Sequence, residues 1–308
     1  MSQNMVIFGG TGFVGRHICA ALNEDVTVVG RSRPHDLPMG AKFVAMDVAR
    51  SGPESIAELL RAESPRIVVN AAGEVWGGDE ERMVRSNVTL VEHLLAALAA
   101  VGGRIRLVHL GSVHEYGAIA QGTRIDEHTE TVPASAYGRT KLQATNAVLD
   151  ATRGGRVSGM VLRVSNVIGP GLSPVSLPGA TTARLRAALG TGEPAVLTLV
   201  SRPEHRDFID VRDLVAAVLA AGESAVEGVV NIARGESVDI RTMVDALVAI
   251  SGVPTEIVTD GEPAWPVRGS DGRQRYDVTA ARTLLGWTPR RNLEEMLRSL
   301  WEAALTAH

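Results

Sequence analysis

The feature that most constrains the fold is a glycine-rich turn near the N-terminus. Gly9, Gly12 and Gly15 recur at every third position, directly after an apolar run at residues 6–8 and at the start of a helical pattern over residues 15–22. A strand that enters a helix through such a turn is typical of a βαβ unit that binds a diphosphate at the helix N-terminus. Gly9 permits the tight turn, Gly12 lets the backbone approach the ligand, and Gly15 allows helix and strand to pack closely. The sequence therefore predicts a dinucleotide-binding segment made by Gly9, Thr11, Gly12, Phe13, Val14 and Gly15.

Apolar runs and helical patterns alternate through the first half of the chain after this turn. We expect strands at residues 26–29, 42–46, 66–70, 106–110 and 159–163, and helices at residues 55–61, 84–98 and 137–149. Such alternation predicts a parallel sheet with helices on both faces, an α/β fold of the Rossmann-like, doubly wound kind. The alternation also disfavours the alternative that the glycines form a turn without a ligand.

The chain changes character after residue 168, where turn-rich segments interrupt the alternation. We expect helices at residues 182–189, 213–221, 243–250 and 293–305, and one further strand at residues 229–232. The sequence predicts a dinucleotide-binding domain at residues 1–168, to which the chain returns around residues 205–233. Residues 169–308 are expected to form mainly a smaller C-terminal α/β lobe, with a charged surface or site loop at residues 260–276.

Composition excludes several classes of protein. Among the 308 residues, 45% are hydrophobic and 21% are charged, which is ordinary for a globular chain. A net charge of -4 and an aromatic content of 4% argue against a nucleic-acid partner. Cys19 is the single cysteine, which excludes a disulfide framework and a cysteine-rich zinc site. No apolar run reaches the roughly 18 residues that cross a bilayer, and the N-terminus has no basic signal region, so we expect no membrane partner and a cytoplasmic location.

The residues after the second expected strand indicate which dinucleotide is bound. An acidic residue at this point accepts hydrogen bonds from a ribose hydroxyl of NAD, whereas an arginine suits the 2′-phosphate of NADP. Here Gly30 is followed by Arg31 and Ser32, which predicts NADPH over NADH, although Arg31 as a solvated surface residue is the alternative. Asp47, followed by Val48, suits a hydrogen bond to the adenine amine, or else caps a turn.

Tyr137 and Lys141 form a pair with catalytic potential. Their spacing of four puts both side chains on one face of the expected helix. A nearby ammonium group stabilises phenolate and lowers the pKa of a tyrosine from near 10. Tyr137 is therefore predicted to act as an acid or base near neutral pH.

With these motifs in place, the chain resembles the extended short-chain dehydrogenase/reductase family, in its nucleotide-sugar branch. The resemblance covers nearly the whole length, and the order and spacing of its motifs are highly specific. It depends on the glycine turn and on Tyr137-x-x-x-Lys141, together with the segments at residues 70–73, 86–89, 111–117, 163–170, 206–213, 231–237 and 285–289.

The resemblance implies roles for individual residues and for the assembly. Ser112 matches the hydroxyl that bonds the reacting oxygen, Tyr137 the proton donor or acceptor, and Lys141 the residue that holds the nicotinamide ribose. The C-terminal lobe is expected to bind a nucleotide-diphosphate sugar, and a homodimer is expected to pair through the helices at residues 84–100 and 137–150. Residues expected at the cofactor are Ala71, Ala72, Gly73, Asn87, Tyr137 and Lys141; those expected at the substrate are Ser112, His114, Asn166, Arg206 and Arg268.

Three chemistries share this scaffold, namely keto-sugar reduction, C4 epimerisation and 4,6-dehydration. Dehydratases carry Asp-Glu after the catalytic hydroxyl, where this chain has Val113 and His114, and valine cannot give a proton. Because Arg31 favours NADPH, net reduction is expected. We interpret the chain as a reductase of a nucleotide-linked keto sugar, of the 4-keto-6-deoxyhexose class. An epimerase with tightly bound NAD(P) and a catalytically silent NADP-sensing protein remain the alternatives.

Overall fold

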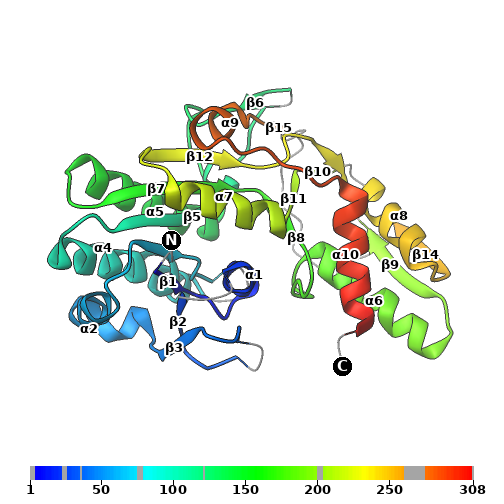
Figure 1. Cartoon of the computed structure of the whole chain (residues 1–308). Helices are drawn as coiled ribbons and strands as arrows, with labels where there is room; N and C mark the ends of the chain where they lie inside the picture. Colours follow the sequence, from blue (N-terminus) through cyan, green and yellow to red (C-terminus); the bar gives the residue numbers. More distant parts are fainter. Residues whose placement is uncertain are drawn as a thin grey trace.

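A seven-stranded parallel sheet forms the larger part of the molecule, in the order β12-β7-β5-β4-β1-β2-β3 (Figure 1). The computed structural model describes residues 4–22, 26–34, 37–74, 79–120, 122–199, 204–259 and 275–306. The chain builds one half of the sheet outward from β1 and then returns to build the other half from β4, which confirms the doubly wound fold. The strands are β1 (Met5–Phe8), β2 (Val26–Gly30), β3 (Lys42–Ala45), β4 (Ile67–Asn70), β5 (Arg106–Ser112), β7 (Ser158–Val164) and β12 (Gly228–Ile232).

Helices cover both faces of this sheet, so its strands are buried on both sides. In β1, Met5 and Ile7 pack into one core, while Val6 and Phe8 pack into the other. This double burial explains why the strands are continuous apolar runs rather than alternating ones. The first core includes residues of α1 (Phe13–Ala21), α7 (Val211–Glu223) and α9 (Thr279–Leu285); the second includes residues of α2 (Val48–Glu63), α4 (Leu90–Val101) and α5 (Ala136–Arg153).

The helical run that precedes β5 differs from the expected single helix. It consists of α3 (Glu80–Val84), a π-helical turn η1 (Arg85–Thr89) and α4. The wider turn shifts the apolar stripe, so Val84 is 37% exposed while Val91 and Leu98 are buried. By length and composition alone, the run Glu80–Val101 would be long and apolar enough to cross a membrane. In this fold most of the large apolar residues of α4 pack between the sheet and the neighbouring helices, which accounts for the composition.

Helix α2 begins earlier than the sequence predicts. Its first turn, from Val48, precedes a kink at Gly52, where φ is 73°. Pro53 follows and starts the regular part of the helix. Because proline suits the first turn of a helix, the sequence pattern predicts the part of α2 after Pro53 more clearly than the turn before Gly52.

The C-terminal part is a smaller α/β unit with a core of its own, seen to the right of the sheet in Figure 1. Here β9 (Ala195–Leu199) pairs in parallel with β14 (Thr255–Thr259), and α6 (Leu177–Thr191), α8 (Ile240–Ser251) and α10 (Leu293–Thr306) pack around them. Very short strands, which periodicity does not reveal, join this unit to the sheet. They pair as β8 (Asn166–Ile168) with β11 (Phe208–Asp210), β10 (His205–Arg206) with β13 (Val238–Asp239), and β6 (Arg124–Ile125) with β15 (Arg275–Tyr276).

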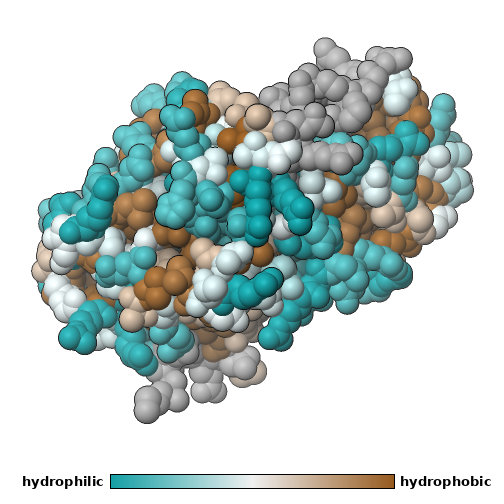
Figure 2. All heavy atoms as spheres, turned by 90° about the horizontal axis from the view of Figure 1, so that it is seen from above, coloured by the Kyte–Doolittle hydropathy of each residue, from teal (hydrophilic) through white to brown (hydrophobic). Residues whose placement is uncertain are grey.

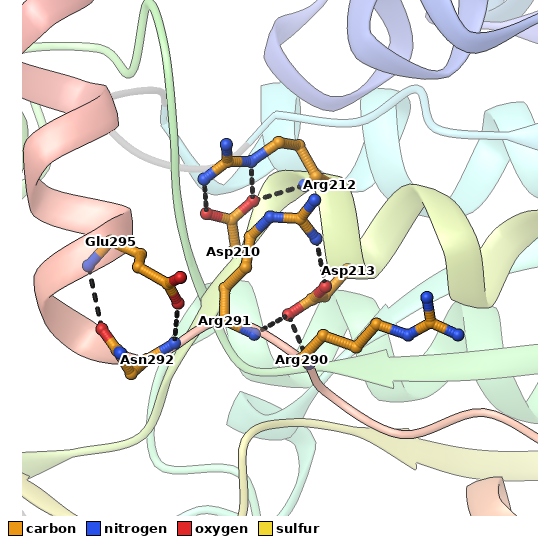
Figure 3. Close-up of polar contacts among 7 residues, drawn as sticks. All are labelled: Asp210, Arg212, Asp213, Arg290, Arg291, Asn292 and Glu295. Carbon is orange, nitrogen blue, oxygen red and sulfur yellow. Dashed lines mark hydrogen bonds and ion pairs between the residues drawn. The ribbon is translucent and has the colours of Figure 1, made fainter.

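Charged groups tie the segment before α10 to the start of α7 (Figure 3). Asp213 accepts hydrogen bonds from the backbone N–H groups of Arg290 and Arg291, both at 2.9 Å, and from the Arg291 side chain at 2.6 Å. Next to it, Arg212 donates to Asp210 through its Nε and Nη2 atoms at 2.8 and 2.7 Å. On the face of the molecule drawn in Figure 2, hydrophilic side chains alternate with small hydrophobic patches, as on most globular proteins.

Candidate active site

A cavity of about 470 Å³ lies beyond the carboxyl ends of β1, β4, β5 and β7. This is the edge at which open parallel sheets bind ligands, beside the point where the strand order reverses. Most residues that the sequence predicts for the site line this cavity. They are Gly12, Phe13, Val14, Ala71, Ala72, Gly73, Asn87, Ser112, His114, Tyr137, Lys141, Asn166 and Arg206.

The glycine turn has the geometry that the sequence predicts. Gly9 has a φ of 77°, and a Cβ built on it would lie 2.5 Å from the backbone nitrogen of Ala72. A Cβ on Gly15 would lie 2.1 Å from the Gly9 carbonyl oxygen, so helix and turn pack closely only with glycine there. Gly12 caps the N-terminus of α1 and lines the cavity. The turn thus forms a cradle of backbone beside a helix N-terminus, and this cradle fits a diphosphate.

The residues predicted to select the cofactor lie at the edge of this site. Arg31 and Ser32 follow β2 and are exposed to solvent, whereas Val48 is buried. Asp47 directly precedes α2, and its carbonyl accepts from the N–H groups of the first turn. These four residues belong to the described part of the chain but not to the cavity lining. A Cβ on Gly30 would lie 2.9 Å from the Thr11 side chain, so a larger residue at that position would displace Thr11.

Ser112, Tyr137 and Lys141 are carried by two adjacent elements. Ser112 ends β5 and caps the 3₁₀ turn η2 (Val113–Glu115), its Oγ accepting from the His114 N–H at 3.2 Å. Tyr137 lies in the first turn of α5, and Lys141 lies one turn further, on the same face. The His114 ring packs edge-on against the Tyr137 ring, with 5.8 Å between ring centroids. The cavity therefore brings together a hydroxyl, a phenol, an imidazole and an ammonium group.

Lys141 is almost completely buried, with 5% of its surface exposed. Its Nζ donates a hydrogen bond to the Leu110 carbonyl at 2.5 Å. Burial lowers the pKa of Lys141 to about 8, and the negative charge of Glu115 opposes that shift. Burial and the charge of Lys141 hold the pKa of His109 well below its usual value, so His109 is neutral beside it. Lys141 is thus mostly protonated at neutral pH and loses its charge in mildly basic solution.

Asn87 lines the cavity, but its amide is engaged by the protein. Its Oδ1 accepts from the Glu74 N–H at 3.0 Å, and its Nδ2 donates to the Glu74 carbonyl and to the Thr140 hydroxyl. Asn87 therefore holds the segment after β4 against α5. A Cβ on Gly73 would lie 2.7 Å from the Asn87 Oδ1, so the glycine is required for this contact.

The opposite side of the cavity holds Asn166 and Arg206, at the start of β8 and in β10. Asn166 donates from Nδ2 to the Asp207 carbonyl at 2.8 Å. Arg206 donates from Nε to Glu204 Oε1 at 2.9 Å, and both side chains are largely buried. Arg268, predicted as a second diphosphate ligand, lies outside the described residues.

Sequence reasoning missed two groups of residues around this cavity. The first is an apolar strip on the C-terminal side, which carries no motif. The second is the buried pair Glu115 and Arg163, for which the sequence does hold a signal, because Ser112-x-x-Glu115 has the spacing of a capping box. The strip consists of Leu172, Val175, Leu177, Pro178 and Phe208.

Comparisons with known proteins place this geometry in a wider group. Residues 5–233 match the profile of the NAD dependent epimerase/dehydratase family. The chain is 43% identical over 314 residues to dTDP-6-deoxy-L-talose 4-dehydrogenase (NAD(P)(+)) of Kitasatospora kifunensis, covering 98% of this chain and 96% of that protein. It is 30% identical over 318 residues to GDP-6-deoxy-D-mannose reductase of Pseudomonas aeruginosa, covering 98% of both. The solved structure of RMD from Pseudomonas aeruginosa complexed with NADPH shares the fold, with a TM-score of 0.83 at 24% identity and 98% coverage of each chain.

Proposed function

The chain belongs to the NAD dependent epimerase/dehydratase family, and from that premise we propose that it is an NADPH-dependent reductase of a nucleotide-linked keto sugar. The substrate class we propose is a nucleoside-diphosphate 4-keto-6-deoxyhexose. The observation that carries the proposal is one cavity whose lining includes both Gly12 of the glycine turn and the Ser112, Tyr137 and Lys141 set. It is supported by similarity along almost the whole chain to two enzymes that act on nucleotide-linked 6-deoxyhexoses.

In this proposal the N-terminal side of the cavity binds the cofactor. Gly9, Gly12 and the start of α1 would hold the diphosphate, and the backbone at residues 71–73 would line the nicotinamide half. Arg31 and Ser32 would bind the 2′-phosphate, and Asp47 the adenine. Asn87 would act through the Glu74 backbone that its amide holds. When bound, the nicotinamide ring supplies the hydride.

The catalytic side chains act on the oxygen of the sugar ketone. Negative charge develops on that oxygen as the ketone is reduced, and donors aimed at it stabilise the transition state more than the ground state. Tyr137 would donate the proton, and Ser112 would donate a hydrogen bond to the same oxygen. Lys141, protonated and one helical turn from Tyr137, would stabilise the phenolate that remains. His114, in contact with the Tyr137 ring, would contact the sugar.

We propose that the C-terminal side of the cavity binds the nucleotide diphosphate. Asn166 and Arg206 would bind its oxygens, and Arg268 would supply a second guanidinium. Guanidinium groups suit phosphates because they offer parallel N–H donors. The apolar strip that includes Leu172 and Phe208 would contact the flat nucleobase or the sugar.

The direct test is turnover of defined nucleotide sugars by the purified chain. We expect loss of NADPH absorbance with one or more nucleoside-diphosphate 4-keto-6-deoxyhexoses, dTDP-linked and GDP-linked sugars being tested side by side. Free sugars should not react, because they lack the diphosphate. If the purified wild-type chain oxidised NADPH with none of the nucleotide sugars, and Tyr137→Phe likewise showed no reaction, the proposal would be overturned.

An epimerase with tightly bound NAD(P) is the second candidate. The family that matches this chain is described as containing epimerases and dehydratases, which is the observation in its favour. An epimerase would retain cofactor through purification and would convert its sugar without added NADPH. A catalytically silent sensor is disfavoured because Ser112, Tyr137 and Lys141 all line one cavity.

We also propose that the protein is a homodimer through the helices at residues 84–100 and 137–150. The outer side of α4 exposes Ala96, Ala99 and Ala100, and α5 exposes Gln143 and Asn146. Small side chains of this kind let helices of two subunits approach closely. Light scattering should give twice the chain mass of 32.6 kDa, and Ala96→Arg should reduce it to one chain.

A further inference from the structure

The carboxylate of Glu115 is fully buried and joins three elements of the active site. Glu115 is 0% exposed and ends the 3₁₀ turn η2 that follows Ser112. Its Oε1 accepts from the backbone N–H of Ser112 at 2.8 Å and from the Thr145 hydroxyl at 2.9 Å. Its Oε2 accepts from Arg163 Nε at 2.8 Å. One side chain thus holds the end of β5, the middle of α5 and strand β7.

The contact with α5 falls on the face of the helix that carries the catalytic groups. Tyr137, Lys141 and Thr145 follow one another at intervals of four residues, so they form one stripe along the helix. Glu115 Oε1 accepts from the hydroxyl of Thr145, the last member of this stripe, and also from the backbone N–H of Ser112. The carboxylate therefore links the residue that carries the hydroxyl to the helix that carries the phenol and the ammonium group.

Arg163 holds the carboxylate in place and is itself held. Its side chain is 5% exposed, lies with its guanidinium carbon 4.8 Å from the centroid of the Tyr116 ring, and donates from Nη1 to the Tyr116 hydroxyl at 3.2 Å. The Tyr116 hydroxyl donates to Asn231 Oδ1 at 2.7 Å. Space for the carboxylate depends on Gly111, because a Cβ there would lie 2.8 Å from Glu115 Oε1. The carboxylate is thus held from several sides, as a group that orients others must be.

We propose that Glu115, held by Arg163, is a positioning residue that sets Ser112 relative to Tyr137 and Lys141. This inference rests on the proposed function, since it concerns the same catalytic set. Its physical reason is that reduction requires both donors to point at one oxygen atom, and small displacements of such groups cost large factors in rate. A buried ion pair that only supported the fold would be replaceable by apolar residues of similar size.

The first test removes one contact and keeps every charge. Thr145→Val deletes the hydroxyl that binds Glu115, and Thr152→Val is the matched control. Thr152 is a buried threonine of the same helix, and its hydroxyl donates to the Val148 carbonyl within α5. We expect Thr145→Val to lower kcat about tenfold, with KM, NADPH affinity and melting temperature like those of Thr152→Val. Equal kcat values in the two variants would overturn the inference.

The second test separates positioning from stability. The double variant Glu115→Leu/Arg163→Met removes both charges together, which proteins often tolerate without loss of stability. We expect a folded protein that binds NADPH but has kcat lowered about a hundredfold. A double variant that retains the wild-type kcat would overturn the inference, whatever its melting temperature.

A third readout needs no substrate and so distinguishes this inference from the proposed function. The Ser112 amide proton, followed by nuclear magnetic resonance, should exchange with solvent slowly in the wild type and in Thr152→Val, and faster in the double variant. If the wild type reduced no nucleotide sugar, the proposed function would fail, whereas faster exchange in the double variant would still support the Glu115 contact. Unchanged exchange would contradict it.

Discussion

The two sides of the cavity rest on different kinds of structure. The catalytic wall, which we define as Ser112, Tyr137 and Lys141, is carried by β5 and α5, a seven-residue strand and an eighteen-residue helix of the large unit. The recognition wall, Asn166 and Arg206, is carried by β8 and β10, strands of three and two residues. Long elements with large buried faces hold side chains more rigidly than short ribbons do.

The two walls also differ in the hydrogen bonds that their residues make with the rest of the protein. On the catalytic wall, Glu115 binds the Ser112 backbone and the Tyr137 helix, Ser112 Oγ accepts from the His114 N–H, and Lys141 Nζ donates to the Leu110 carbonyl. On the recognition wall, Arg206 is itself paired with Glu204, and Asn166 donates to the Asp207 carbonyl. A diphosphate bound there would share the Arg206 guanidinium with Glu204, because a guanidinium carries five N–H donors. In the proposed function, catalysis would use groups that the fold already holds in place, whereas recognition would use groups that also bind protein partners.

The largest effect is expected on the catalytic wall. Tyr137→Phe keeps the ring and its packing but removes the proton, and general acid catalysis of this kind contributes about 10²–10⁴-fold. We expect kcat to fall at least about a hundredfold, with NADPH affinity unchanged. Single-turnover NADPH oxidation is the measurement, and Ser112→Ala should lose less, because Tyr137 still bonds the oxygen. A near-normal rate in Tyr137→Phe would mean that another group, with His114 nearest, supplies the proton.

A smaller effect is expected at Arg31, which lies at the edge of the site and belongs to neither wall. Arg31→Ala removes a charge-assisted hydrogen bond to a 2′-phosphate, a contact of about 1.5–3 kcal/mol. The ratio of kcat/KM for NADPH to that for NADH should therefore fall about tenfold to a hundredfold. Arg61→Ala, which removes an exposed arginine of α2, is the control and should leave the ratio unchanged. Equal use of both cofactors by the wild type would contradict the assignment of Arg31.

On the recognition wall the expected change is in KM. Arg206→Met removes the guanidinium and keeps the chain length, so KM for the nucleotide sugar should rise about tenfold while kcat changes little. Arg212→Met is the matched control, because Arg212 is also paired with a carboxylate but lies away from the cavity lining in the described structure. A fall in kcat without a change in KM would mean that Arg206 belongs with the catalytic groups.

The smallest effect concerns pH. The pKa of Lys141 is lowered to about 8, so its positive charge is present below that pH and is lost above it. His109, Glu115 and Tyr137 are the titratable groups that face it, and His109 is neutral in this range. We expect kcat to fall as pH rises through about 8. Lys141→Arg stays charged in this pH range, so its kcat should not fall as the pH rises. If kcat of Lys141→Arg still fell, the pH dependence would belong to another group.

Much of the large unit is readable from local sequence. Glycine spacing, apolar runs and the Tyr137-x-x-x-Lys141 interval all concern residues within one turn or one strand. Their consequences, the parallel sheet and a shared cavity for the predicted residues, follow from general rules of βαβ folds. The short ribbons around Asn166 and Arg206 were missed because two or three residues carry no detectable period.

What the sequence by itself determined is the fold class, the glycine turn and the catalytic helix face, because neighbours in the chain decide these features. What only the tertiary structure decided is which polar groups bind one another. Glu115 and Arg163 are 48 residues apart, and Asn87 and Thr140 are 53 apart. Such contacts depend on the packing of several elements at once, and no local pattern encodes that packing.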